Sequence, residues 1–487
     1  MKALRFRRNL PRYAAARLAG SLTPGRGATV GPLELVDLDP PAEPGPDWVR
    51  VRPRLSGICG SDLATVDGRS ARYFEPLVSF PFVPGHEVVG DLDDDQRVVL
   101  EPVLGCASRN ITPACAACAD GRLGNCEHTT FGDLSPGIQT GSCHDTGGGW
   151  ATAFHAHPSQ LHPVPDGLSD EAAVMVEPTA CGVHAAFTAR VPDNGVVAVL
   201  GAGTLGLVTI AALRAHTTPR TIVATARYPD QRRLADELGA DLVVAPDEIR
   251  RAVRRAAGTR AIGGNGQGPE GDVDRLTGGA DTVIDCVGSS SSLTDALAVA
   301  RPGGRIVLLG MPAVVELELT PLWHRELELV GSYTYGTEAL PDGSTARTFD
   351  LAFDLVTRAD LGRLVTATYP LARYREALQH AASAGSRGAV KVAFDLRDER
   401  ERNARCPTDN TPHHARDSCS TWTGTPRRSC STTGPASASR NCPPAGPGSS
   451  TRPNPSKASP TPRRPSATPS STRSATPHHC PPSCGPA

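Results

Sequence analysis

Three short segments of this 487-residue chain carry side chains that suit a catalytic metal site. They read GICGSD, GHE and VEP, and their polar residues are Cys59, Ser61, Asp62, His86, Glu87 and Glu177. A thiolate, an imidazole and a carboxylate bind Zn²⁺ and leave one coordination position open, which a catalytic zinc needs for a substrate oxygen. Glycines beside the first two segments allow the backbone to approach a compact site closely. The three segments together predict a catalytic zinc.

A second group of metal-ligating side chains is a cluster of four cysteines. The cluster consists of Cys106, Cys115, Cys118 and Cys126. Four thiolates can enclose zinc tetrahedrally without an open position, and such a structural site stiffens the loop that carries it. Eight residues separate Cys106 from Cys115, more than a usual first pair of ligands has between them. The alternatives are free structural thiols and a three-cysteine site completed by another residue.

A glycine-rich segment between an apolar run and a helical pattern predicts a dinucleotide site. The run VVAVL is followed by GAGTLG, which contains Gly201, Gly203, Thr204, Leu205 and Gly206, and then by LVTIAALRAH. Gly201 permits a tight turn, Gly203 lets the backbone approach a pyrophosphate, and Gly206 allows close packing of helix on strand. The start of the helix offers free N–H groups and a positive dipole end to the phosphates.

The end of the next predicted strand bears on the choice of dinucleotide. An NAD enzyme usually has Asp or Glu there to hold the ribose 2′-hydroxyl. This chain has Ala226, followed by Arg227. A missing carboxylate removes repulsion toward a 2′-phosphate, and a guanidinium offers donors to it, so NADP(H) is favoured over NAD(H). The alternative is that Arg227 is a solvated surface residue.

The elements that must position these residues change in character along the chain. Up to residue 176, short β-like runs such as KALRF and WVRVRPRL alternate with Gly and Pro, which indicates a β-rich domain. Across 177–325, apolar strands alternate with helices, the pattern of a parallel sheet covered on both faces. We expect residues 326–397 to return and complete the first domain. The predicted fold class is α/β.

The composition changes abruptly near the end of the chain. From Glu401 onward there is no Leu, Ile, Val, Phe, Met or Tyr, and Pro, Ser, Thr, Ala and Arg fill most positions. Such a segment buries too little apolar surface to offset the entropy of ordering, so we expect residues 398–487 to be a disordered tail. An out-of-frame reading of a GC-rich gene would give the same change.

Charge and hydropathy exclude several classes of protein. Residues 401–487 carry 11 Lys+Arg and 3 Asp+Glu, a net of +8, and the first 400 carry the remaining 39 and 48, a net of -9. The acidic main body does not attract nucleic acid by charge. No run of about 18 apolar residues predicts a transmembrane helix, and the N-terminus lacks the features of a signal peptide. We therefore expect a cytoplasmic protein with no nucleic-acid and no membrane partner.

As an ordered set, these motifs resemble those of the zinc-containing medium-chain dehydrogenase/reductase family. They are GICGSD, GHEVVG, the four-cysteine lobe, EP before a helix, VLGAGTLG and GGRIVLLG, within residues 1–396. The resemblance is to alcohol, polyol, threonine and glucose dehydrogenase-like members. It implies a GroES-like catalytic domain, with a structural zinc lobe at 104–128, interrupted by a Rossmann doubly wound sheet. It also implies a homodimer or homotetramer.

The resemblance also implies roles for individual residues. By position, Cys59, His86 and Glu177 would ligate the catalytic zinc, with Cys181 as the rival of Glu177 for third ligand. Asp62 would orient a ligand through the His86 ring, as metal-bound histidine requires.

Two further positions would take part in the chemistry, and one departs from the family pattern. Ser61 falls where the family keeps a hydroxyl that receives the alcohol proton. Glu87 would be a neighbouring polar group or an exchanging fourth ligand. Many relatives have His five residues after the zinc cysteine, where this chain has Ala64, so the usual proton relay is broken or rerouted.

The combined prediction is an enzyme with two zinc ions per chain. It would transfer a hydride between a small-molecule alcohol, such as a polyol, a sugar or a similar secondary alcohol, and NADP(H) or NAD(H). The alternatives are a non-catalytic NADPH-binding protein on the same fold and a zinc-free quinone or enone reductase. The second alternative would lack the thiol lobe and GHE.

Overall fold

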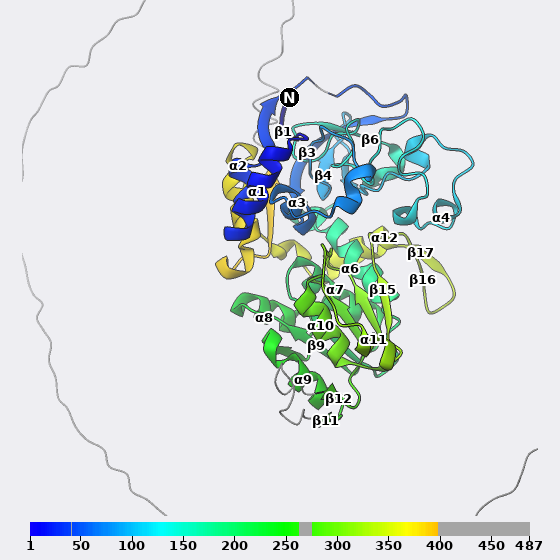
Figure 1. Ribbon diagram of the computed structural model, residues 1–487. Coiled ribbons are helices and arrows are strands. Elements are labelled where there is room, and N and C mark those ends of the chain that lie inside the picture. Colours follow the sequence, from blue (N-terminus) through cyan, green and yellow to red (C-terminus); the bar gives the residue numbers. More distant parts are fainter. Residues whose placement is uncertain (40, 263–274, 398–487) are drawn as a thin grey trace, which may run out of the picture. The chain divides into compact units, whose positions relative to one another are not determined.

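Six parallel strands form the sheet at the centre of the nucleotide-binding half of the chain (Figure 1). The structure is a computed structural model that describes residues 1–39, 41–262 and 275–397, so the predicted tail lies outside the described residues. The strand order is β10–β9–β8–β13–β14–β15. The strands are β8 (Val196–Leu200), β9 (Thr221–Thr225), β10 (Leu242–Val244), β13 (Ala280–Asp285), β14 (Ala300–Leu308) and β15 (Glu328–Gly331).

The sequence of these strands explains the arrangement. All five residues of β8, the run VVAVL, are buried, as expected of a central parallel strand covered on both faces. The predicted Rossmann sheet is therefore confirmed. The sheet extends past the predicted boundary at residue 325, because β15 pairs in parallel with β14.

Helices that follow the strands pack on this sheet or against one another. They are α7 (Thr204–His216), α8 (Pro229–Glu237), α9 (Ile249–Ala256), α10 (Ser290–Val299) and α11 (Thr320–His324). Two further helices, α6 (Val176–Thr188) and α12 (Thr348–Arg358), pack with each other and with α7. Glu177 lies on α6, so the packing of α6 on α7 joins the segment that carries Glu177 to the nucleotide-binding half.

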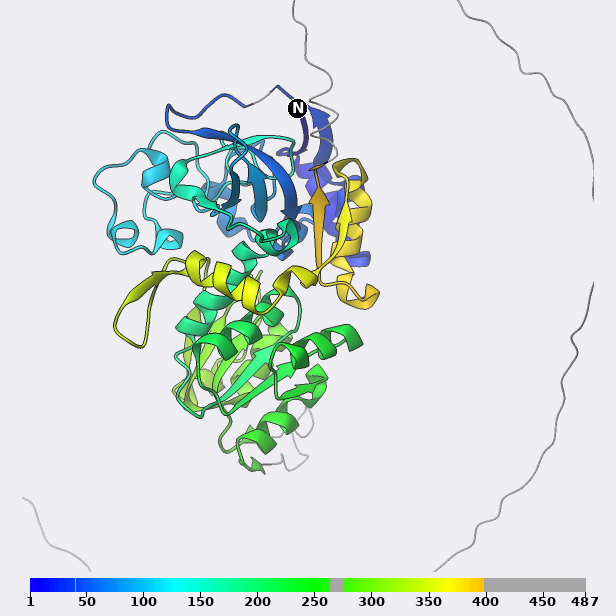
Figure 2. The ribbon, with the colours of Figure 1, turned by 180° about the vertical axis from the view of Figure 1, so that it is seen from behind.

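A seven-stranded sheet forms the frame of the other half of the chain. Its path is β18–β19–β3–β4–β5–β7, and β6 pairs with β3. The strands are β3 (Val49–Gly57), β4 (Val88–Asp91), β5 (Arg97–Leu100), β6 (Phe154–Ala156), β7 (Leu161–Pro163), β18 (Val365–Tyr369) and β19 (Lys391–Asp395). β19 pairs antiparallel with β3, with Ala393 opposite Gly57. The last described strand thus returns to the first domain, and Figure 2 shows the two gold strands beside the blue ones.

Several shorter elements connect the strands of the two sheets. The helices are α3 (Gly60–Val66), α4 (Ala116–Ala119) and α13 (Tyr374–Ala382), and the strand pairs are β11 (Ala261–Ile262) with β12 (Arg275–Leu276) and β16 (Thr337–Ala339) with β17 (Thr345–Arg347). The 3-10 helices are η1 (Arg72–Leu77), η2 (Ala107–Arg109), η3 (Leu123–Asn125), η4 (Pro158–Gln160), η5 (Pro246–Glu248), η6 (Leu361–Leu364), η7 (Leu371–Arg373) and η8 (Ala384–Arg387). Among the described helices, none is long and apolar enough to cross a bilayer.

The helical pattern around Glu177 is divided into two helices. α5 (Asp170–Val174) begins after the N-cap Ser169, whose side chain accepts from the Ala172 N–H. α6 starts two residues after α5 ends, which places Pro178 in its first turn. The N–H groups of a first turn have no partner within the helix, so proline is tolerated there. Pro178 therefore lies at a new helix start, and Glu177 lies beside it in the same turn.

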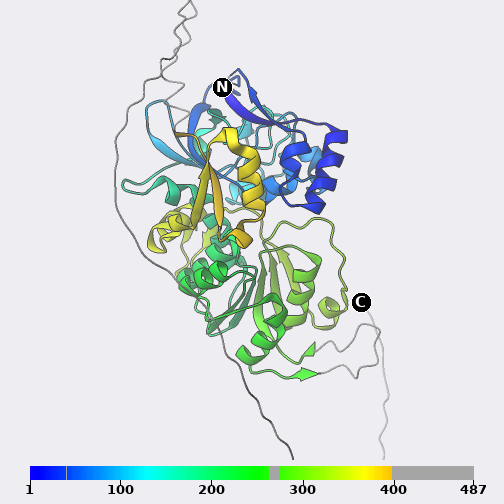
Figure 3. The same ribbon diagram turned by 90° about the vertical axis from the view of Figure 1, so that its left-hand side faces the viewer.

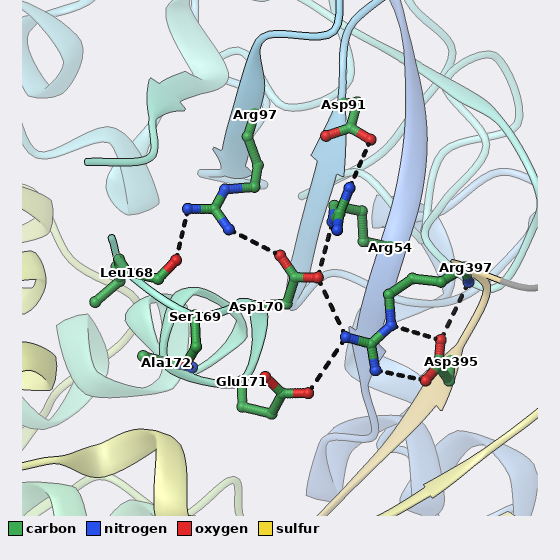
Figure 4. A network of polar contacts seen from close by, with 10 residues as sticks. All are labelled: Arg54, Asp91, Arg97, Leu168, Ser169, Asp170, Glu171, Ala172, Asp395 and Arg397. Carbon is green, nitrogen blue, oxygen red and sulfur yellow. Dashed lines mark hydrogen bonds and ion pairs between the residues drawn. The ribbon is translucent and has the colours of Figure 1, made fainter. Parts of the chain in front are cut away.

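A network of ion pairs joins α5 to the seven-stranded sheet (Figure 4). The buried Asp170 carboxylate accepts from Arg54 at 2.8 Å, from Arg97 at 3.1 Å and from Arg397 at 3.3 Å. Arg397 also donates to Asp395 at the end of β19, at 2.6 Å. A buried carboxylate is tolerated when it is paired and hydrogen-bonded in this way. The network fixes the start of the α5–α6 segment on β3, β5 and β19.

The structure adds two helices near the N-terminus that the sequence reasoning missed. β1 (Lys2–Phe6) and β2 (Leu33–Asp37) pair antiparallel, and the chain between them forms α1 (Leu10–Leu22) and α2 (Gly27–Val30). Asn9 caps α1 by accepting from the Arg12 N–H at 3.1 Å. Figure 3 shows both helices at the outer edge of the domain.

Candidate active site

Two of the three predicted ligands of the catalytic zinc, Cys59 and His86, converge with Glu87 at the end of β3 and the start of β4. Cys59 is the N-cap of α3, and His86 and Glu87 directly precede β4. One ligand atom from each of the three lies within 4.8 Å of the others. His86 and Glu87 are buried, and Cys59 is half-buried. A thiol, an imidazole and a carboxylate at this separation fit a zinc ion by the chemistry of their donor atoms.

Asp62 contacts two members of this group. Its Oδ2 accepts from the Cys59 N–H at 3.0 Å, and its Oδ1 lies 3.5 Å from His86 Nδ1. This leaves His86 Nε2 as the ring nitrogen available to a metal, the arrangement that a histidine ligand needs. Burial lowers the pKa of His86, but the Asp62 carboxylate and the Cys59 side chain outweigh it and hold the pKa well above its usual value.

Glu87 is held by a lysine that the sequence reasoning missed. Lys391 Nζ lies 2.6 Å from Glu87 Oε1 and 2.5 Å from Oε2, and only 3% of the lysine is exposed. Burial lowers the pKa of Lys391, but Glu87 outweighs it and raises the pKa above its usual value. A Cβ on Gly57 would lie 2.0 Å from Glu87 Oε2, so only glycine fits at that position of β3.

Glu177 approaches the group from α6 without belonging to it at the 4.8 Å separation. Its carboxylate is buried and forms no ion pair with any residue that the structure describes. Burial raises the pKa of Glu177 to about 7, with nearby Glu87 raising it further and His86 opposing both. Cys181, the rival ligand, lies one turn along α6 with its Sγ 3.9 Å from Glu177 Oε1. Both candidates for third ligand therefore lie on one helix face beside the group.

Ser61 is the second residue of α3 and is partly exposed. Its carbonyl accepts from Thr65 Oγ1 at 3.0 Å, whereas its hydroxyl forms no hydrogen bond within the described ranges. The Ser61 hydroxyl is therefore available to a ligand, two residues after Cys59.

The four predicted lobe cysteines also come together. The Sγ atoms of Cys106, Cys115, Cys118 and Cys126 all lie within 4.8 Å of one another. The long gap after Cys106 is taken up by η2 and by Asn110, which has a left-handed conformation at φ 53°. Burial raises the pKa of Cys115, but backbone N–H groups of Glu127 and Cys118 outweigh it and lower the pKa to about 6. Four thiols at this separation fit a closed zinc site.

A buried arginine supports this lobe from inside. Arg109 is 0% exposed, and its guanidinium donates to the carbonyls of Leu104 at 3.2 Å, Phe131 at 2.9 Å, Leu134 at 3.2 Å and Gly137 at 2.6 Å. Burial lowers the pKa of Arg109. The carbonyl of Ser135 accepts as well, and these carbonyls around one guanidinium satisfy the buried donors and hold the loop closed. The sequence gives no signal for this role, because the acceptors are backbone atoms.

The glycine-rich segment has the geometry that a pyrophosphate requires. Gly201 has a φ of +92° and its N–H donates to Thr225 Oγ1 at 2.8 Å. A Cβ on Gly206 would lie 1.8 Å from the Gly201 carbonyl oxygen, whereas one on Gly203 would meet open space. Thr204 and Leu205 are the first two residues of α7, so their N–H groups are free of intrahelical partners. The segment fits a dinucleotide phosphate at the start of α7.

Two arginines lie at the end of β9, where a dinucleotide ribose would come. Arg227 follows Ala226 and is exposed. Arg232, which the sequence reasoning did not single out, donates from its Nε to the Ala226 carbonyl at 3.1 Å. The structure thus brings a second guanidinium to the position predicted for one.

Comparison with known proteins supports the assignment of both halves. The family model "Alcohol dehydrogenase GroES-like domain" matches residues 45–166, and the model "Zinc-binding dehydrogenase" matches residues 204–347. A sorbitol dehydrogenase of Arabidopsis thaliana is 30% identical over 372 residues, which cover 72% of this chain and 89% of that protein. An L-idonate 5-dehydrogenase of Vitis vinifera is 30% identical over 373 residues, with the same coverage.

Solved structures share the fold. Galactitol-1-phosphate dehydrogenase from Escherichia coli superposes with a TM-score of 0.57 at 20% identity, covering 81% of this chain and all of that one. At this identity the likeness concerns the fold, and it agrees with a GroES-like domain joined to a six-stranded Rossmann sheet. With the sequence relatives, it shows that the chain belongs to the zinc-binding medium-chain dehydrogenase family, whose members are NAD(P)-dependent alcohol and polyol dehydrogenases.

Proposed function

We propose that this chain catalyses reversible hydride transfer between a polyol, or a similar secondary alcohol, and NADP(H). The observation that carries the proposal is the convergence of Cys59, His86 and Glu87 within 4.8 Å, in a chain that also has a glycine-rich turn shaped for a dinucleotide. The relatives named above as sorbitol and L-idonate dehydrogenases support a polyol as substrate.

Cys59, His86 and Glu177 are the ligands that we assign to the catalytic zinc. Glu87 is nearer to the first two in the structure, but Lys391 already neutralises its charge through both oxygens. Glu177 is a buried carboxylate without an ion-pair partner among the described residues, and a cation would offset the cost of burying its charge. Cys181 is the alternative third ligand.

The chain's own groups prepare the site for the reaction. When bound, zinc supplies Lewis acidity and the nicotinamide accepts or returns the hydride. Asp62 Oδ1 holds a proton on His86 Nδ1 and so fixes the ring orientation. The Ser61 hydroxyl receives the proton of the substrate alcohol, since it lies free beside Cys59. Ala64 cannot pass this proton on, so it leaves through water.

The choice of NADP(H) rests on Arg227 and Arg232. No carboxylate stands at Ala226 to repel a 2′-phosphate, and the Nε–H of Arg232 is fixed on the Ala226 carbonyl. Two guanidinium groups at one strand end give a 2′-phosphate a set of charge-assisted donors. NAD(H) has no 2′-phosphate, so neither guanidinium would have a phosphate to bind.

The four-cysteine lobe holds a second, structural zinc in this proposal. The closed set of thiols leaves no position for substrate, so the ion stabilises the loop rather than taking part in the reaction. Arg109 and the metal would both hold the loop of the lobe closed.

We further propose a homodimer formed through the edge of the Rossmann sheet. β15 pairs with β14 on one side only within the described residues, and Leu329 on it is 38% exposed. An exposed edge strand pairs readily with the same strand of a second copy around a two-fold axis. Light scattering on Leu329→Glu against the parent chain tests this, and an unchanged mass would reject it.

Zinc content together with activity tests the proposed reaction. The parent chain should hold about two zinc ions, and Cys59→Ala should lose about one of them together with polyol oxidation. Cys143→Ala is the matched control, because Cys143 is a buried thiol outside both donor groups. The control should keep both ions and its activity. Full activity of a folded, zinc-stripped Cys59→Ala enzyme would refute the proposal.

A further inference from the structure

An apolar face of α1 points away from the protein. Leu10, Leu18 and Leu22 are 68%, 67% and 78% exposed, and Ala14 between them is exposed as well. Residues four apart in a helix lie on one side, and each step turns the position by about 40°, so these four residues cover an arc of about 120°. The face is as broad as the stripe by which a helix usually packs on a core.

The opposite side of α1 is fixed to the domain, so the apolar face cannot turn inward. Ala16 and Gly20 are buried, and a Cβ on Gly20 would lie 2.7 Å from the Asp67 side chain. Asp67 itself is buried and accepts from the N–H groups of Gly25 and Gly27, at 2.8 and 3.0 Å. The segment after α1 is therefore tied to the same carboxylate that packs against the helix.

The charged residues in the sequence of this segment are all basic. The first 33 residues contain seven Lys+Arg and no acidic residue, and Glu34 is the first carboxylate in the chain. Arg12 and Arg17 lie on α1, are exposed, and form no ion pair with any residue in the described ranges. A helix with an apolar face bordered by unpaired arginines is typical of segments that lie in the surface of an anionic bilayer.

Two other occupants of the face do not fit. The C-terminal residues 401–487 have Trp422 as their only large apolar side chain and carry a net charge of +8, so they match the face neither in hydropathy nor in charge. A second copy docking α1 on α1 would bring Arg12 and Arg17 of both copies together, and like charges repel. An anionic lipid surface meets both requirements.

We propose that α1 binds this enzyme reversibly to anionic membrane surfaces. The helix lies before residue 45, where the match to the GroES-like family model begins. It revises the expectation of no membrane partner, which rested on the absence of a spanning segment. Three leucines and two arginines would bind weakly, so the enzyme would exchange between the surface and solution.

Flotation of the full-length protein with lipid vesicles tests the proposal. Vesicles of phosphatidylglycerol and phosphatidylcholine should carry the protein upward, and pure phosphatidylcholine vesicles should not. Leu18→Ser with Leu22→Ser should lower the partition coefficient by about tenfold or more, because these side chains enter the bilayer surface. Arg12→Gln with Arg17→Gln should lower it comparably, by about tenfold, and high salt should mimic that change.

The controls separate α1 from other causes of binding. Val314→Ser removes a side chain that is 97% exposed elsewhere on the surface and should leave binding unchanged. Circular dichroism and dehydrogenase activity should match the parent chain in every variant, since none of these residues belongs to the active site. Binding that survives Leu18→Ser with Leu22→Ser would come from the basic C-terminal segment, and the proposal would be wrong. Absence of binding to anionic vesicles, or a dimer that the leucine variant dissolves, would also overturn it.

Discussion

Lys391 meets both carboxylate oxygens of Glu87, at 2.6 and 2.5 Å, although 304 residues separate the two in the chain. The pair is buried, with 3% and 1% of the side chains exposed. It lies directly against the donors Cys59 and His86, so the charge next to the candidate metal site is set by a residue from the last described strand. The finding makes β19 part of the candidate active site.

Removing the lysine should damage both stability and activity. In Lys391→Met, the buried Glu87 charge would be left uncompensated, and breaking such a pair typically costs about 3–5 kcal/mol in the free energy of unfolding. Loss of a partner next to metal ligands typically costs about 10- to 100-fold in activity or metal affinity. Urea denaturation and steady-state kinetics with zinc analysis measure the two effects.

The double variant serves as the control for this prediction. Glu87→Gln with Lys391→Met removes both charges, so it should lose less stability than Lys391→Met alone. Equal losses in the single and double variants would mean that the ion pair is not what makes Lys391 important.

Cofactor preference should depend on Arg227 and Arg232. Arg227→Ala should raise the KM for NADP⁺ by about tenfold and leave that for NAD⁺ nearly unchanged, because a charge-assisted contact to the 2′-phosphate is lost. Arg232→Ala should act in the same direction. Arg233→Ala is the matched control, since its guanidinium is bound to Glu237 at 2.7 Å on the same helix. A parent enzyme that prefers NAD⁺ tenfold would show the assignment to be wrong.

Acid sensitivity should depend in part on Asp395. Burial raises the pKa of this carboxyl, but hydrogen bonds from Arg397 outweigh it and hold the pKa below its usual 3.8. The unfolded chain therefore binds the proton more readily, so the pair stabilises the fold fully above pH 3.8 and less as the pH falls through the lower, folded-state pKa. Asp395→Asn and Arg397→Gln should each lose less stability than the parent between about pH 5 and pH 3.

Urea midpoints across this pH range, with zinc present throughout, measure the effect. Asp395→Asn should be the less stable protein near pH 6 and should approach the parent as the pH falls. A constant difference between the two at every pH would show that the carboxyl contributes nothing specific to acid unfolding.

Features set by local sequence were predictable. GAGTLG after VVAVL led to the correct turn, because the positive φ of Gly201 and the close approach of Gly206 to the Gly201 carbonyl follow from backbone sterics within a few residues. The cysteine spacing likewise led to a four-thiol cluster, which the structure forms. The Rossmann order of strands followed from alternation of apolar runs with helices.

Features set by distant contacts were not predictable. Lys391 was missed because its partner lies in a segment far away in sequence, although it is one of only three lysines in the chain and stands in an apolar strand. Arg109 was missed because it binds backbone carbonyls, which every sequence supplies. Helix α1 was missed because its leucines face solvent and its buried side is formed by Ala16 and Gly20, so the hydropathy pattern that usually identifies a helix does not describe a buried face here.

The pairing of β19 with β3 also orders events during synthesis. The ribosome delivers Gly57 and Glu87 long before Ala393 and Lys391, so until β19 has been synthesised β3 lacks this partner strand and Glu87 has no counter-ion. A nascent chain, or a fragment ending before β18, would therefore hold its thiol and imidazole beside an unbalanced negative charge. The reaction centre is complete only after β19 has been synthesised, long after Cys59 and His86.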